Sequence, residues 1–166
     1  MTTYERSVRV AAPFEAVWEF HSGIAGLEAL TPDWLHLRIE RVRGPDGEAD
    51  PEVLAPGSVV RASIRPLGVG PRQRWTSHIT ARARHAGAGY FRDAMTDGPF
   101  RRWEHTHAFY ADGEATVVRD RVVYDLPLGG LGRRLGPLAV VGLEPMFRYR
   151  HRRTRELLEG AAGRNL

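Results

Sequence analysis

The chain has 166 residues and a mass of 18.6 kDa, a length that fits one domain with a sizeable core. Its 42% hydrophobic and 27% charged residues exclude an intrinsically disordered chain. Cysteine is absent, which excludes disulfides, a thiol nucleophile and cysteine-bound metals, and no apolar run approaches the ~20 residues of a membrane span. We therefore expect one domain over residues 1–166, and the lack of an apolar signal segment predicts a cytoplasmic location.

Arginine supplies all 24 basic residues of the chain, and lysine is absent. This excludes catalysis through a lysine Schiff base and a phosphate-binding loop that uses a lysine. The net charge of +4 and the isoelectric point near 10.1 occur in many nucleic-acid-binding proteins. Acidic residues are spread among the arginines throughout, so we interpret the charge as a feature of composition and expect no nucleic-acid partner.

The first third of the chain predicts two strands with short helices between them. Pro13 suits the first turn of a helix, and apolar residues follow it at helical spacing as far as His21. Gly, Pro and acidic residues make 44–57 a surface loop. The predicted elements are a strand over 4–11, a helix over 13–21, a short helix over 27–30 and a strand over 34–42.

The remainder predicts an antiparallel meander followed by a helix. Alternating patterns with turn residues between them predict strands over 58–65, 74–82, 88–95, 100–110 and 115–126. The alternation gives the meander one mainly apolar face and one solvated face. A Gly- and Pro-rich loop over 127–137 precedes a final helix to about Glu159, which Pro145 is expected to kink or divide.

Three stretches of sequence carry a resemblance to a known superfamily. They are FRDAM at 91–95 with GPFRRWEHTHAF at 98–109, DRVVYDLPLG at 120–129, and FRYR at 147–150. With the order of elements, they resemble the START-like or SRPBCC superfamily, in its polyketide cyclase/dehydrase-like ligand-binding branch. The resemblance implies an α+β helix-grip fold: a curved antiparallel sheet of about six to seven strands wraps around a long C-terminal helix, with two short helices after the first strand. It also implies a cavity that holds a hydrophobic ligand.

Polar residues interrupt the apolar face predicted for strands 100–110 and 115–126. Alternation places His105 and His107 between two aromatic residues on one face. A hairpin turn centred on Asp112-Gly113 would place His105 directly opposite Asp120, on the same face. A one-residue bulge would instead turn Arg119 and Arg121 to that face.

Three interpretations of His105, His107 and Asp120 stay open. The first is a hydrogen-bonded polar group within the core, because a buried carboxylate needs partners. The second is a set of polar fixtures in a ligand pocket. The third is catalysis, with these three residues as candidates, or metal binding by two histidines and a carboxylate; we expect no metal. The pocket interpretation predicts an enclosed cavity of roughly 300 Å³ or more.

The remaining candidate ligand-binding residues are mostly aromatic. At helical positions around Phe147, Arg150 falls near the centre of the predicted buried arc, whereas Arg148, Arg152 and Arg155 form an outer stripe. Arg150 is expected either to extend to water or to pair with Asp93, Asp120 or a ligand carboxylate. The full set of candidates is Trp75, Phe91, Asp93, Met95, Trp103, His105, His107, Asp120, Tyr124, Phe147 and Arg150.

Three functions therefore compete. The leading hypothesis is binding of a hydrophobic small molecule (a lipid, polyketide or aromatic metabolite) between the sheet and the C-terminal helix. The alternatives are a cyclase or dehydratase that uses a His/Asp pair in that cavity, and a module that binds protein or RNA through its arginine-rich surface. No cofactor is implied, and the sequence does not predict the oligomeric state.

Overall fold

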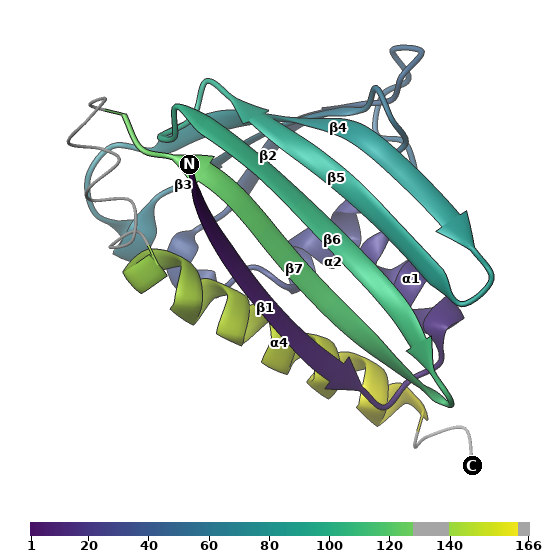
Figure 1. Ribbon diagram of the computed structural model, residues 1–166. Helices are drawn as coiled ribbons and strands as arrows, with labels where there is room; N and C mark the ends of the chain where they lie inside the picture. Colours follow the sequence, from purple (N-terminus) through teal and green to yellow (C-terminus); the bar gives the residue numbers. More distant parts are fainter. Residues whose placement is uncertain (128–139, 163–166) are drawn as a thin grey trace.

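The computed structural model describes residues 1–127 and 140–162. Seven antiparallel strands form one curved sheet in the order β1-β7-β6-β5-β4-β3-β2 (Figure 1). Almost all of the predicted loop 127–137 lies outside the described residues. The strands are β1 (Thr2–Val10), β2 (Arg38–Arg43), β3 (Val59–Ile64), β4 (Gln73–His85), β5 (Ala88–Thr96), β6 (Arg102–Asp112) and β7 (Ala115–Asp125).

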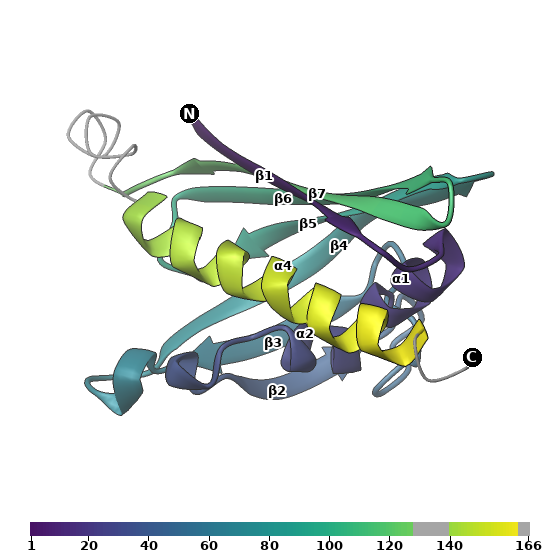
Figure 2. The ribbon, with the colours of Figure 1, turned by 90° about the horizontal axis from the view of Figure 1, so that it is seen from below.

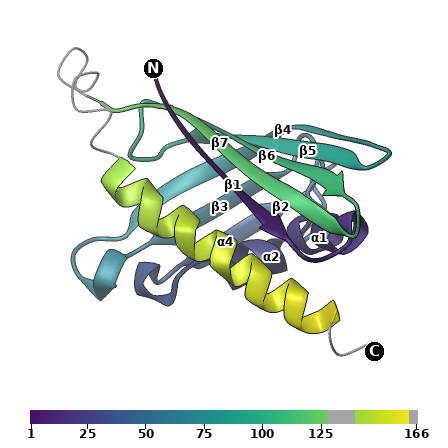
Figure 3. The ribbon, with the colours of Figure 1, turned by 60° about the horizontal axis from the view of Figure 1, so that its bottom comes forward.

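Three helices lie on the concave side of the sheet: α1 (Phe14–His21), α2 (Ile24–Ala29) and α4 (Val140–Ala162). Figures 2 and 3 show α4 running diagonally under the sheet, with β1 on one side of it and β2 and β3 on the other. The predicted helix-grip α+β fold, with two short helices after the first strand, is therefore confirmed. Within the described residues, no helix combines the length and the hydropathy needed to cross a membrane.

The strand predicted over 34–42 begins later than expected, at Arg38. Pro32 leads into a short 3-10 turn over Asp33–Leu35, and His36 then adopts a left-handed conformation with φ of 46°. Pairing with β3 begins only after this turn, at Arg38. Residues 34–37 of the predicted strand therefore lie outside β2.

A bulge in β4 changes which residues face the helices. The pairing with β5 shifts between Ile79 and Ala81, so one extra residue separates the two halves of the strand. Unbroken alternation would place Arg82 on the outer face. Instead its guanidinium lies 4.6 Å from the ring centre of Trp18 and donates a 2.8 Å hydrogen bond to Ser22 Oγ.

The hairpin between β6 and β7 differs from the prediction by two residues. Asp112 pairs with Ala115, so His107, and not His105, lies directly opposite Asp120. Gly113 has a φ of +61° and takes the first central position of the turn, which belongs to a turn type that favours glycine there. A shift of two residues keeps the same faces, because side chains alternate with a period of two.

Helix α4 continues without a break through Pro145, so the predicted division is wrong. Pro145 lies in the second turn, where few backbone hydrogen bonds precede it, and Leu143 and Phe147 pack into the core on either side of it. The same face continues with His151 and Thr154, both buried. The predicted outer stripe is exposed, and each of its arginines pairs with a glutamate one turn away: Arg148 with Glu144, Arg152 with Glu156 and Arg155 with Glu159.

Two apolar clusters of the described core lie on either side of a polar group. One joins α1 to the ends of β6 and β7 near the hairpin, around Trp18 and Phe109. The other joins α4 to the opposite ends of these strands, around Trp103 and Phe147. His105, His107 and Asp120 occupy the strand positions between the two clusters, so the fold places a polar group in the middle of its apolar interior.

Trp18 packs directly on the backbone of Gly89 in β5. A Cβ at this position would lie 2.6 Å from the indole ring, which is too close for any real contact. We expect Gly89→Ala to destabilise the fold by about 1–3 kcal/mol, measured by urea denaturation. Gly142→Ala is the matched control: it lies in α4 with open space around it, so alanine should stabilise by up to about 1 kcal/mol. An unchanged midpoint for Gly89→Ala would contradict this packing.

Candidate functional site

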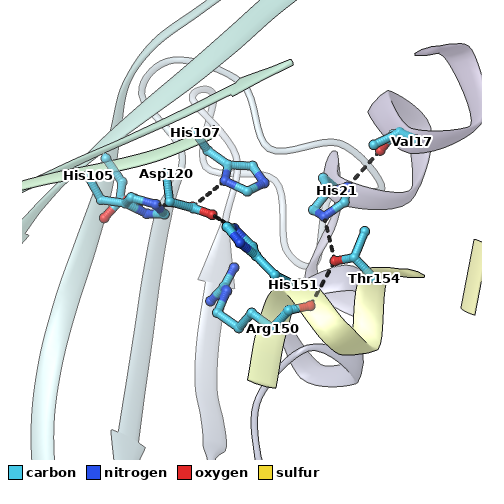
Figure 4. Close-up of polar contacts among 9 residues, drawn as sticks. Val17, His21, His105, His107, Asp120, Arg150, His151 and Thr154 are labelled. Atoms are coloured by element: carbon cyan, nitrogen blue, oxygen red, sulfur yellow. Dashed lines mark hydrogen bonds and ion pairs between the residues drawn. The ribbon is translucent and has the colours of Figure 1, made fainter. Parts of the chain in front are cut away.

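Asp120 of β7 is the centre of the candidate site. Its side chain is fully buried, and it accepts hydrogen bonds from three histidines (Figure 4). Oδ1 accepts from His105 Nε2 at 2.6 Å and from His107 Nδ1, while Oδ2 accepts from His151 Nε2 at 2.6 Å. Burial opposes the charge of this carboxylate, but the histidines and their hydrogen bonds outweigh that cost and hold the pKa of Asp120 well below its usual range. Asp120 is therefore ionised.

His105 links two carboxylates. Its Nε2 donates to Asp120 and its Nδ1 donates to Asp93 Oδ1 at 3.2 Å, while Ser77 holds the other oxygen of Asp93. Burial disfavours the charged ring, but the hydrogen bonds to the two carboxylates outweigh it and raise the pKa of His105 to about 9. His105 is thus a cation at neutral pH and balances part of the negative charge in the site.

His107 has the opposite protonation. Burial is the main cause that lowers its pKa, and the positive charges of His105 and Arg150 act in the same direction. The neutral ring donates Nδ1–H to Asp120, so its Nε2 carries a lone pair. That nitrogen is buried and has no hydrogen-bond partner among the described residues. His151 Nδ1 is likewise buried without a hydrogen-bond partner among the described residues, and Nε2 of His151 is the nitrogen bound to Asp120.

His21 of α1 adds a further neutral imidazole. Burial lowers its pKa to about 3, with His107 and Arg150 contributing. Its Nδ1 donates to the carbonyl oxygen of Val17 at 2.7 Å, and its Nε2 lies 3.5 Å from Thr154 Oγ1. The Thr154 hydroxyl donates instead to the carbonyl oxygen of Arg150 at 2.9 Å. His21 Nε2 therefore has only a long contact.

Arg150 does not form the predicted ion pair with Asp93 or Asp120. Histidines already occupy both carboxylates, and the described residues contain no ion pair of Arg150. Its guanidinium carbon lies 5.8 Å from the ring centre of Phe147, and its Nε is buried without a hydrogen-bond partner in the described part of the chain. Figure 4 shows the guanidinium pointing from α4 toward the histidine cluster.

The apolar candidates lie on both sides of this polar group. Phe91 has its ring centre 5.1 Å from that of His107, and Phe147 has its ring centre 5.5 Å from that of His105. Trp103, Tyr124, Met95 and Phe147 belong to the cluster near the start of α4, and Phe91 packs on the cluster around Trp18. Trp75 is half-buried on the concave face of the sheet, in β4. It lies farther from Asp120 along the sheet.

His105, His107 and Asp120 also have the composition of a metal site, with ligand atoms within 4.8 Å of one another. In the structure, however, both histidines direct protons at the carboxylate. The carboxylate is therefore the point on which the nitrogens converge. A metal ion shared by all three would have to displace both protons and move the side chains apart.

A separate hollow of about 250 Å³ lies on the outer face of the sheet, away from the helices. It is lined by residues of β4, β5 and β6, among them Tyr90, Arg92, Thr106 and Tyr110. These positions alternate with Phe91, His105 and His107, so the hollow does not connect with the histidine cluster. The cavity predicted between sheet and helix stays a prediction.

Comparisons with known proteins place the sequence in a family. The family model described as Domain of unknown function (DUF8410) matches residues 8–158. The chain belongs to this family. A search of the curated proteins finds no match for this DUF8410 chain.

Solved structures of the same fold are similar to the DUF8410 chain at low sequence identity. A protein from Thermus thermophilus is 21% identical with a TM-score of 0.61, covering 96% of this chain and 99% of its own. A START superfamily protein from Mycobacterium smegmatis is 17% identical with a TM-score of 0.60, covering 93% and 98%. Norcoclaurine synthase from Thalictrum flavum is 14% identical with a TM-score of 0.61, covering 95% and 87%. The fold is that of the START-like, or SRPBCC, superfamily.

Two histidines of the DUF8410 site, His151 and His21, were absent from the predicted set. His151 follows Phe147 by four residues and precedes Thr154 by three, which is the spacing of one helix face. That spacing was a sufficient signal, although the predicted buried arc is centred on Arg150. His21 lies at helical spacing with the apolar residues of α1, but nothing in the sequence indicates that α1 meets α4 there.

Proposed function

We propose that the protein binds a hydrophobic small molecule between the concave face of the sheet and α4. The observation that carries this proposal is a set of buried polar atoms without partners among the described residues, at His107 Nε2, His151 Nδ1 and Arg150 Nε, between two aromatic clusters. Buried polar atoms are normally paired within a protein, and each unpaired one destabilises the fold. A ligand with an apolar body and a polar group would satisfy them.

The comparisons support the proposal at the level of the fold. The chain shares its architecture with a START superfamily protein and with norcoclaurine synthase, and the latter was solved in complex with dopamine and hydroxybenzaldehyde. The proposed ligand class is accordingly a lipid, polyketide or aromatic metabolite. We also propose that the protein is related to the polyketide cyclase/dehydrases and that it lies in the cytoplasm.

A second candidate function is acid–base catalysis by the pair His107 and Asp120. One observation favours it: the carboxylate accepts Nδ1–H and leaves Nε2 unprotonated, which is the orientation that a general base needs. The lowered pKa of His107 weighs against it, because a ring that holds a proton poorly is a weak base at neutral pH. Ligand binding requires only that the lone pair of His107 Nε2 accepts a hydrogen bond.

Binding of protein or RNA through the arginine-rich surface is supported less well. The outer stripe of α4 pairs its three arginines with glutamates on the same helix. These pairs reduce the positive charge that a phosphate backbone would meet.

Native mass spectrometry of the protein purified from its own host tests the proposal. We expect a population whose mass exceeds that of the chain by one small molecule, and this population should collapse to the chain mass on denaturation. Arg152→Met, an exposed change, should retain the same molecule. A preparation that carries no molecule, and that takes up no aromatic or lipid probe at millimolar concentration, would contradict the proposal.

A further inference from the structure

The unpartnered atoms between the sheet and α4 differ in hydrogen-bonding character. His107 Nε2 is an acceptor, because its ring is neutral and its Nδ1 donates to Asp120. His151 Nδ1 is a further buried nitrogen without a partner among the described residues. His21 Nε2 is a second acceptor, since its ring is neutral and its Nδ1 donates to Val17, and its only described contact is the long one with Thr154 Oγ1. Arg150 Nε is a donor on a permanent cation. The site therefore presents two imidazole acceptors and one charged donor.

This combination selects among ligand groups. A carboxylate or phosphate would meet Arg150 favourably, but its oxygens would face the lone pairs of the neutral imidazoles. A ketone or ether could accept from Arg150 and would leave the imidazole nitrogens unpaired. A hydroxyl satisfies both requirements, because its hydrogen is donated to a nitrogen and its oxygen accepts from the guanidinium.

Building on the proposed function, we infer that the ligand carries a hydroxyl group that donates to His107 Nε2 and accepts from Arg150 Nε. His107 is the preferred acceptor because its Nε2 has no hydrogen-bond partner among the described residues and because aromatic rings flank it. The ring centres of Phe91 and Phe109 lie 5.1 and 4.5 Å from that of His107, so the body attached to the hydroxyl meets aromatic surface. A phenol or an enol of a polycyclic compound has this chemistry.

Asp120 and His105 position the acceptor. Asp120 binds Nδ1–H of His107 and so fixes the tautomer whose Nε2 is free. Burial is the main reason that the pKa of His107 is lowered, and the positive charge of His105 acts in the same direction, which preserves the lone pair. Neither residue needs to contact the ligand, and we assign both as positioning residues.

Three naphthalene probes of nearly equal size test the inference by isothermal titration calorimetry at pH 7. 2-Naphthol can donate and accept, 2-methoxynaphthalene can only accept, and 2-naphthoate is an anion. We expect 2-naphthol to bind at least about tenfold more tightly than 2-methoxynaphthalene, because the ether leaves the buried nitrogen unpaired. 2-Naphthoate should also bind more weakly than 2-naphthol.

Two variants assign the contacts. His107→Phe should remove most of the preference for 2-naphthol over 2-methoxynaphthalene while still binding both. Arg150→Met should weaken both probes and keep the preference, because both contain the oxygen that accepts from Nε. Arg152→Met, the exposed control, should bind all three probes as the parent does. If His107→Phe does not fold, the parent and Arg150→Met still decide the matter.

The outcomes separate this inference from the function on which it rests. Equal binding of 2-naphthol and 2-methoxynaphthalene would overturn the hydroxyl inference and leave ligand binding standing. Tightest binding of 2-naphthoate would overturn it in favour of an anionic ligand. Binding of none of the three probes would overturn the inference of a hydroxyl on an aromatic body, whereas ligand binding itself is decided by the mass-spectrometric test.

Discussion

Replacing Asp120 by asparagine is expected to destabilise the fold by about 3–5 kcal/mol, because the change removes one partner of a buried ionic network. The carboxylate is fully buried and accepts hydrogen bonds from His105, His107 and His151. An asparagine amide has one accepting oxygen, and its NH₂ group would face an imidazole N–H. The cation on His105 would also lose its shorter carboxylate contact, leaving only Asp93. Urea denaturation measures the effect.

Asp112→Asn is the matched control for this change. Asp112 lies in the same hairpin, and its ion pair with Arg9 is exposed, with more than half of each side chain accessible to solvent. Exposed pairs of this kind contribute less than about 1 kcal/mol. If Asp120→Asn and Asp112→Asn shift the urea midpoint equally, Asp120 does not have the structural role described.

Stability is expected to fall as pH rises from 6.5 to about 9, and His105 is the cause. The pKa of His105 is near 6.5 in the unfolded chain and about 9 in the folded protein, so the folded state binds the proton more tightly. The contribution of His105 to the unfolding free energy is complete below pH 6.5. It declines between pH 6.5 and about 9 and is absent at higher pH. The difference between the folded and unfolded pKa values of His105 corresponds to about 3 kcal/mol of unfolding free energy.

The composition of the chain makes the pH dependence of its stability between pH 6.5 and 9 simple to interpret. The chain has no lysine or cysteine, and the lowered pKa values of His21 and His107 act as pH falls below 6.5, in the opposite direction. His105→Gln should therefore have a nearly flat unfolding free energy between pH 6.5 and 9. His85→Gln, at an exposed position, should keep the slope of the parent. A parent protein with no decline in this range would show that His105 is not the cation that links Asp93 and Asp120.

The sequence predicted the architecture well because alternation and turn residues determine it locally. All five strands predicted after residue 57 form, and the long helix follows them. The errors occur where one residue changes the geometry. The turn uses Gly113 in its first central position, and the bulge in β4 adds one residue, and neither event leaves a mark in the hydrophobic pattern.

The site was predicted in part for a related reason. Alternation along β6 and β7 placed His105, His107 and Asp120 on one face, and that placement survives a shift of two residues. The contributions of α1 and α4 depend on how the helices cross the sheet, which no local pattern specifies. His151 and Arg150 are adjacent in sequence, and the rotation of α4 about its own axis decides which of the two binds Asp120.

A crystal structure of the protein grown with 2-naphthol tests the central proposal most directly, because it locates the ligand. We expect electron density for the probe between β6 and α4, with its oxygen within hydrogen-bond distance of both His107 Nε2 and Arg150 Nε. Density confined to the outer hollow near Tyr90 and Tyr110 would contradict the account, as would an interior that stays closed at saturating probe.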